Sequence, residues 1–77
     1  DIAIIRRQES IENGQIAAVI VNGEEATIKK VRLLPDGIML IGLNTEVYEP
    51  HFYSKQEISD LPVRIYGKLV EVRRKFY

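Results

Sequence analysis

The sequence contains no cysteine, and this absence excludes two kinds of site. Without thiols there is neither a disulfide framework nor a thiolate metal site, and such a chain fits a reducing cytoplasm. The single histidine, His51, lies in an irregular stretch beside Pro50. Because one imidazole does not make up a metal site without further ligands, we interpret His51 as a surface or packing residue. We therefore expect no metal ion and no cofactor.

Long hydrophobic runs and an excess of one charge are also lacking. The longest apolar runs have about six residues, well short of the ~20 that cross a bilayer, so we expect no membrane segment. Eleven basic and eleven acidic side chains cancel, which argues against direct nucleic-acid binding because such surfaces are usually basic. With 45% hydrophobic and 29% charged residues, the 77-residue chain has the composition of one small folded domain.

Five segments rich in β-branched residues, with turn signals at their ends, predict strands. They span residues 1–7, 15–21, a long segment that begins near Glu24, 37–43 and 63–76. The near-continuous apolar character of residues 15–21 predicts burial on both faces of that strand. Asn22–Gly23 and Pro35–Asp36–Gly37 have the chemistry of tight turns, so the middle three segments are expected to form antiparallel hairpins.

The rest of the chain adds bends and one short helical signal. Residues 44–62 form an irregular excursion with two prolines, in which Ser54 and Glu57 have capping-box spacing and predict a short helical turn. Gly67, inside the last strand, predicts a bulge or bend. Together these signals predict an all-β domain, in which small, bent antiparallel sheets form a partly open barrel or a coiled sheet.

Two adjacent lysines, Lys29 and Lys30, raise the main chemical question. Neighbouring side chains on a strand point to opposite faces, and Lys29 shares its face with Val31 and Leu33 whereas Lys30 shares its face with Arg32. Lys29 is therefore the better candidate for burial. A lysine amine against an apolar surface loses hydration of its charged form and can act as a general base near neutral pH. Periodicity alone favours the alternative that both lysines are solvated.

The other polar clusters have simple structural interpretations. The three serines, Ser10, Ser54 and Ser59, occur in polar, turn-like contexts where a hydroxyl usually caps or turns the backbone. The basic residues 73–75, with Arg64 and Lys68, are interpreted as a solvated edge, with phosphate contact as the alternative. From its residues alone, the sequence indicates a small soluble β domain and leaves its function open.

Three stretches occur in an order and at a spacing that carry a resemblance. They are "DIAIIRRQESIENGQIAAVIVNGEEATIKKV", the "LPDGIMLIGLN" hairpin with the following "NTEVYEP", and "RIYGKLVEVRR". In this order they resemble the C-terminal domain of LexA and phage CI-type repressors, a family of self-cleaving serine peptidases that also includes UmuD-like proteins. The basic ending "VRRKFY" is most similar to prophage helix-turn-helix repressors of Gram-positive bacteria.

The resemblance implies a mechanism in which a neutral lysine takes the proton of a serine hydroxyl, and the alkoxide attacks a peptide bond of the protein itself. Lys29 falls on the position of this general base. The family's nucleophile is a serine followed by methionine, upstream of the position of Asp1. The only methionine here is Met39, which follows Ile38. The resemblance therefore implies that the nucleophile lies outside these residues and that they are inactive alone.

The resemblance also implies an organisation and a set of partners. We expect residues 1–77 to be a single domain, the C-terminal part of a repressor's regulatory and peptidase domain of the SOS response, in the cytoplasm. A homodimer, DNA contact only through a separate N-terminal helix-turn-helix domain, and a RecA-type co-protease are the expected partners. Two alternatives remain: a fragment of a signal-peptidase-like processing peptidase, which shares the Ser/Lys chemistry, and a non-enzymatic small β-barrel binding module.

Overall fold

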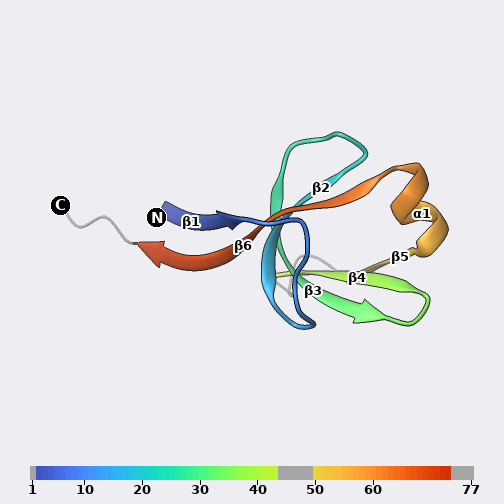
Figure 1. The fold of residues 1–77 in the computed structure, drawn as a ribbon, viewed down its shortest axis with the longest axis horizontal. Coiled ribbons are helices and arrows are strands. Elements are labelled where there is room, and N and C mark those ends of the chain that lie inside the picture. Colours follow the sequence, from blue (N-terminus) through green and yellow to red (C-terminus); the bar gives the residue numbers. More distant parts are fainter. Residues whose placement is uncertain (1, 44–49, 74–77) are drawn as a thin grey trace.

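The computed structural model describes residues 2–43 and 50–73, which form one antiparallel sheet with a short helix (Figure 1). The six strands lie in the order β1-β6-β2-β3-β4-β5. The elements are β1 (Ile2–Arg7), β2 (Ile16–Val21), β3 (Thr27–Leu34), β4 (Gly37–Gly42), β5 (His51–Ser54), α1 (Lys55–Asp60) and β6 (Val63–Arg73). The two edge strands, β1 and β5, are not paired with each other. The all-β prediction is confirmed, in the form of an open, coiled sheet.

Strand β6 lies between β1 and β2 and bends twice along its length. It pairs with β2 from Val21↔Val63 to Ala17↔Lys68, and with β1 from Arg7↔Gly67 to Ile2↔Arg73. The register shifts once in each ladder, so Tyr66 and Val70 are extra residues on β6. Bulges of this kind bend a strand and increase its twist. The bend expected near Gly67 is therefore present, and beyond it β1 and β6 leave the body as a two-stranded ribbon (Figure 1).

The core is small and lies on one face of the sheet. Five buried side chains from β2, β3, β4 and β6 form one cluster: Ala17, Val19, Val31, Leu40 and Val63. Helix α1 adds Ile58 to the edge of this cluster. On the opposite face Ala18 is also buried, so the expected burial of β2 on both faces is confirmed. We call the face that carries the cluster the core face.

The turn at Asn22 and Gly23 forms as predicted, but strand β3 starts later than expected. Both residues have positive φ, 55° and 69°, and the Glu24 N–H donates to the Val21 carbonyl at 3.1 Å. Continuing that register would pair Val19 with Ala26, whereas the ladder pairs Val19 with Thr27. The register set by the turn therefore differs by one residue from the register of the β2–β3 ladder. Residues 24–26 therefore lie outside the strand, and the predicted start near Glu24 was wrong.

The excursion before β6 contains a strand that the sequence analysis missed. Strand β5 pairs with β4 from Leu40↔His51 to Gly37↔Ser54. A side chain at Gly37 would overlap the Tyr53 carbonyl oxygen, so glycine permits the close approach of the two strands. Helix α1 follows at once, and its capping box is present as predicted. The Glu57 N–H donates to Ser54 Oγ at 3.2 Å, and the Ser54 N–H donates to Glu57 Oε1 at 3.1 Å.

Two predicted segments extend beyond the described residues, and one further prediction concerned a membrane segment. Residues 44–49 of the excursion and residues 74–77 of the last predicted strand lie outside the described residues. Within the described ranges, no helix has the length and apolarity that a membrane span requires.

Candidate functional site

Lys29 lies on the core face of the sheet. It pairs with Ala17 on β2 and with Gly42 on β4, and directly paired residues share a face. Ala17 is fully buried, as is Val31 two residues farther along β3. Lys30 pairs with Ile16 and therefore belongs to the opposite face. Lys29 is half-buried and Lys30 is exposed, so the expected difference between the two lysines is confirmed.

The neighbours of Lys29 leave space for its side chain on the sheet surface. Ala17 carries only a methyl group, and Gly42 carries no side chain. A lysine stem can lie along such an apolar surface while its amine reaches the boundary with water.

A second lysine shares the row, and the sequence analysis did not find it. Ala17 also pairs with Lys68 on β6, so Lys29 and Lys68 flank Ala17 on the same face. Their Cα atoms lie two strand spacings apart, about 10 Å. The predicted solvated edge is wrong for Lys68, because β6 lies between β1 and β2 and Lys68 is half-buried. The pairing depends on the exact position of the bulge, at Tyr66, which the prediction of a bulge or bend at Gly67 does not specify.

The serines occupy the backbone roles expected of them or lie exposed. Ser54 caps α1, and Ser59 is an exposed residue of the same helix. The Ser10 carbonyl accepts a hydrogen bond from Gln8 Nε2 at 2.7 Å. Ser10 and Lys68 also line a small polar hollow of about 260 Å³.

His51, two of the arginines and two of the tyrosines contact other side chains of the domain. His51 is exposed, and its ring centroid lies 4.2 Å from that of Tyr53. Among the described residues, no group of three or more histidine and acidic side chains is placed to hold a metal ion. Arg73 Nε lies 3.2 Å from Glu71 Oε1, an exposed pair of the kind that contributes little stability. The Arg7 guanidinium lies 5.7 Å from the centre of the Tyr66 ring.

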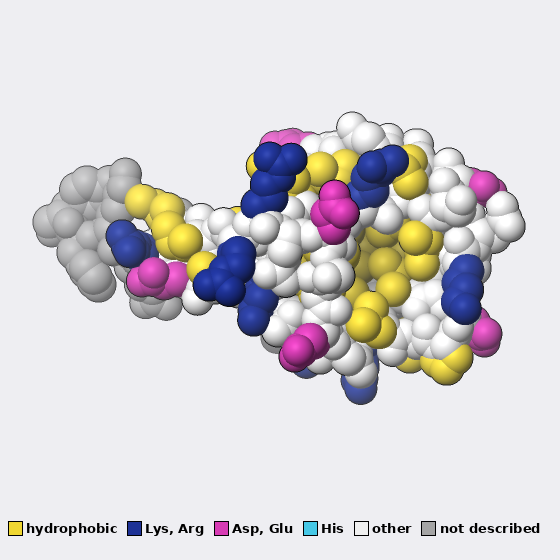
Figure 2. All heavy atoms as spheres, in the orientation of Figure 1, with side chains coloured by type: hydrophobic (Ala, Val, Ile, Leu, Met, Phe, Trp, Pro, Cys, Tyr) yellow, Lys and Arg dark blue, Asp and Glu magenta, His cyan; other side chains and the backbone are white. Residues whose placement is uncertain are grey.

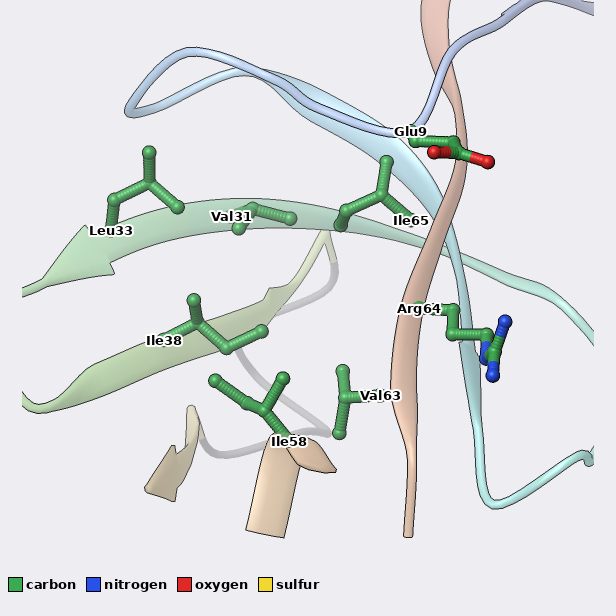
Figure 3. A pocket seen from close by; sticks show the side chains of 8 residues that line it. All are labelled: Glu9, Val31, Leu33, Ile38, Ile58, Val63, Arg64 and Ile65. Carbon is green, nitrogen blue, oxygen red and sulfur yellow. The ribbon is translucent and has the colours of Figure 1, made fainter. Parts of the chain in front are cut away.

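The core face also contains a hollow of about 390 Å³, which we call the aliphatic hollow. Figure 2 shows hydrophobic side chains on the floor of a depression in this face. The aliphatic residues that line it come from β3, β4, α1 and β6: Val31, Leu33, Ile38, Ile58, Val63 and Ile65. Glu9 and Arg64 are also among the lining residues, and the Arg64 side chain points away from the aliphatic side chains (Figure 3). This feature arises from residues far apart in the sequence.

Comparison with known proteins gives a consistent result over nearly the whole chain. The family described as Peptidase S24-like matches residues 1–70. A LexA repressor of Gluconobacter oxydans is 38% identical over 76 residues, which are 99% of this chain and 29% of the relative. A LexA repressor of Pseudothermotoga lettingae is 36% identical over 74 residues, 96% of this chain and 34% of the relative. A third, of Erythrobacter litoralis, is 33% identical over 84 residues, 100% of this chain and 30% of the relative. The chain thus spans about a third of the length of these relatives.

Proposed function

The chain belongs to the Peptidase S24-like family, and from this premise we propose that it is the dimerisation and self-cleavage domain of a LexA-like repressor. Lys29 is the general base in this proposal. Its neutral amine takes the proton of a serine hydroxyl supplied from outside the 77 residues, and the alkoxide attacks a peptide carbonyl of the repressor. When the tetrahedral intermediate collapses, the lysine ammonium returns the proton to the leaving amine.

The placement of Lys29 supports this role. Between Ala17 and Gly42, the side chain lies on the core face, half-buried beside the fully buried Val31. An amine works as a base only in its neutral form. Lys30 has the same chemistry at the next position but is exposed on the opposite face. The two lysines therefore give a matched pair for experiment.

The proposal includes a homodimer, for which the β1–β6 ribbon supplies the surface. The ribbon projects from the body (Figure 1) and exposes Val70 and Val72 to 46% and 54%. A two-stranded ribbon is at best marginally stable alone in water, and a second copy would cover these side chains. Pairing two repressors also suits DNA half-sites about one helical turn apart, contacted through a separate helix-turn-helix domain. A cytoplasmic location, prophage-type regulation and a RecA-type co-protease complete the proposal.

The test is self-cleavage of the full-length repressor at alkaline pH, where more of a lysine is neutral. Lys29→Ala is expected to slow cleavage by about 100-fold or more, which is the usual effect of removing a general base. Lys29→Arg should be equally slow because arginine keeps the charge but does not deprotonate in proteins. Lys30→Ala is the control and should cleave at the normal rate. Normal cleavage by Lys29→Ala, with its circular dichroism unchanged, would remove Lys29 from the mechanism.

A further inference from the structure

The chain contains two Asn-Gly pairs, Asn13–Gly14 and Asn22–Gly23. In such a pair the backbone nitrogen of the glycine can attack the side-chain amide carbon of the asparagine, and glycine has no Cβ to hinder the attack. All four residues are exposed, so access to water does not distinguish the two pairs. The hydrogen bonds around them do.

In the first pair, both reacting groups are held by strand β3. Asn13 Oδ1 accepts a hydrogen bond from the Leu33 N–H at 2.8 Å. The Gly14 N–H donates to the Val31 carbonyl, also at 2.8 Å, and Val31 is fully buried. The attacked amide and the attacking nitrogen are thus fixed to the same strand. Because both bonds must break before the two groups can meet, attack at Asn13 is disfavoured.

In the second pair, the hydrogen bonds lie outside the reacting groups. The Asn22 N–H donates to the Pro62 carbonyl at 2.9 Å, and the Glu24 N–H donates to the Val21 carbonyl at 3.1 Å. Within residues 2–43 and 50–73, no hydrogen bond involves the Asn22 side chain or the Gly23 N–H. The peptide plane between the two residues can therefore turn over while the bonds on either side of it stay in place.

This motion brings the reacting groups of the second pair together. Positive φ at both Asn22 and Gly23 is that of a type I′ turn. There ψ of the first central residue is about +30°, which directs the next nitrogen away from the side chain. Turning the plane gives a type II′ turn with ψ of about −120°, which directs that nitrogen toward the side-chain amide carbon. The turn at Asn22 thus reaches the reactive geometry without opening the hairpin.

We propose that Asn22 is a modification site at which the folded protein deamidates, while Asn13 is protected. The Gly23 nitrogen forms a bond to Asn22 Cγ, the bond from Cγ to Nδ2 breaks, and ammonia leaves with the proton of the Gly23 amide. Water then opens the cyclic imide at one of its two carbonyls and leaves aspartate or isoaspartate. Either product adds a negative charge beside Glu24 and Glu25. Isoaspartate also adds one backbone carbon to the turn of the hairpin that carries Lys29.

Incubating the full-length protein in heavy-oxygen water at mildly alkaline pH tests the proposal. Water that opens the imide leaves a heavy oxygen in the new carboxylate, which separates conversion in the folded protein from conversion during later digestion. Tandem mass spectrometry then assigns the label to residue 13 or residue 22. In the folded protein, Asn22 should convert at least about tenfold faster than Asn13, because only Asn13 must lose hydrogen bonds first. In concentrated urea this ratio should fall below about threefold, since unfolded chains keep only weak local structure.

Two controls test the reason for the difference. Asn22→Gln should stop labelling at residue 22 and leave Asn13 unchanged, because the longer side chain closes a less favourable six-membered ring. Amide hydrogen exchange in the unaltered protein should be at least about tenfold slower at Gly14 than at Gly23, since only the Gly14 N–H is bonded. This second measurement needs no variant.

Three results would overturn the proposal. They are equal labelling of the two asparagines in the folded protein, faster labelling of Asn13, or exchange at Gly14 as fast as at Gly23. Labelling of Asn22 that occurs only in urea would overturn it as well. The Lys29→Ala variant separates this site from the catalytic proposal, because its asparagines should convert at the same rates whether or not Lys29 is the base.

Discussion

Replacing Gly67 with alanine is expected to destabilise the protein, although its backbone conformation alone would favour alanine. Gly67 is not among the residues with positive φ. At such a position Gly→Ala usually stabilises a protein by about 0.4–1 kcal/mol, because alanine restricts the unfolded chain. A Cβ atom at Gly67 would, however, overlap Ile5 Cγ2 and lie 2.6 Å from the Arg6 carbonyl oxygen. Steric overlap and unfolded-state entropy therefore oppose each other at this residue.

The steric effect is the larger of the two. The Ile5 side chain can rotate away, but the Arg6 oxygen belongs to the backbone of β1, which pairs with β6 at Lys68. Restoring an ordinary contact would require β1 to move by about 0.9 Å, since the Arg6 oxygen would lie at 2.6 Å and heavy atoms in contact usually lie near 3.5 Å. Added methyl groups in packed sites typically cost about 1–3 kcal/mol. After the entropic gain, we expect the free energy of unfolding to fall by about 0.5–2 kcal/mol.

Urea unfolding followed by circular dichroism measures this change. With a slope near 1 kcal/mol per molar urea for a chain of this size, the midpoint should fall by about 0.5–2 M. Ile5→Ala removes one of the two obstructing groups, so the Gly67→Ala and Ile5→Ala double variant should lose less stability than the sum of the single variants. An increase in stability for Gly67→Ala would refute the close packing of β1 against β6.

Two further predictions test the helix cap and the dimer. Ser54→Ala removes the hydroxyl that accepts the Glu57 N–H and should lower the free energy of unfolding by about 1 kcal/mol, as N-cap replacements do. Ser59→Ala, on the exposed side of α1, is the control, and equal losses for both variants in urea unfolding would contradict the capping role. Val72→Lys places a charge on the ribbon and should convert the dimer to a monomer in sedimentation experiments, since interface cores exclude charge. Leu43→Lys, at a residue 58% exposed away from the ribbon, should remain a dimer, and a dimeric Val72→Lys would show that the ribbon is not the interface.

The features that depend on short-range chemistry were predictable from the sequence. Asn22 and Gly23 take positive φ in a tight turn because few other residues do so easily. Ser54 and Glu57 form a capping box because their spacing alone brings each side chain to the other's backbone. The difference between Lys29 and Lys30 follows in the same way from the alternation of side chains along a strand. In each case the decisive contacts span only a few residues.

The features that the sequence analysis missed depend on pairing between distant segments. Strand β5 has four residues after a proline, and it is a strand only because β4 supplies its hydrogen-bonding partner. The position of β6 between β1 and β2 follows from long-range pairing that periodicity does not encode. The row that contains Lys68, Ala17 and Lys29 depends in turn on that order and on the bulge at Tyr66. A shift of one residue at this bulge would move Lys68 to the opposite face.

The bulge at Tyr66 also divides β6 into two parts with different neighbours. Before it, residues 63–65 have β2 on one side and the aliphatic hollow beside the other. From Gly67 onward, the same strand pairs with β1 and forms the ribbon that exposes Val70 and Val72. Because the aliphatic hollow and the ribbon lie on different sides of this bulge, Leu33→Lys should leave the dimer intact in sedimentation experiments, whereas Val72→Lys should convert it to a monomer.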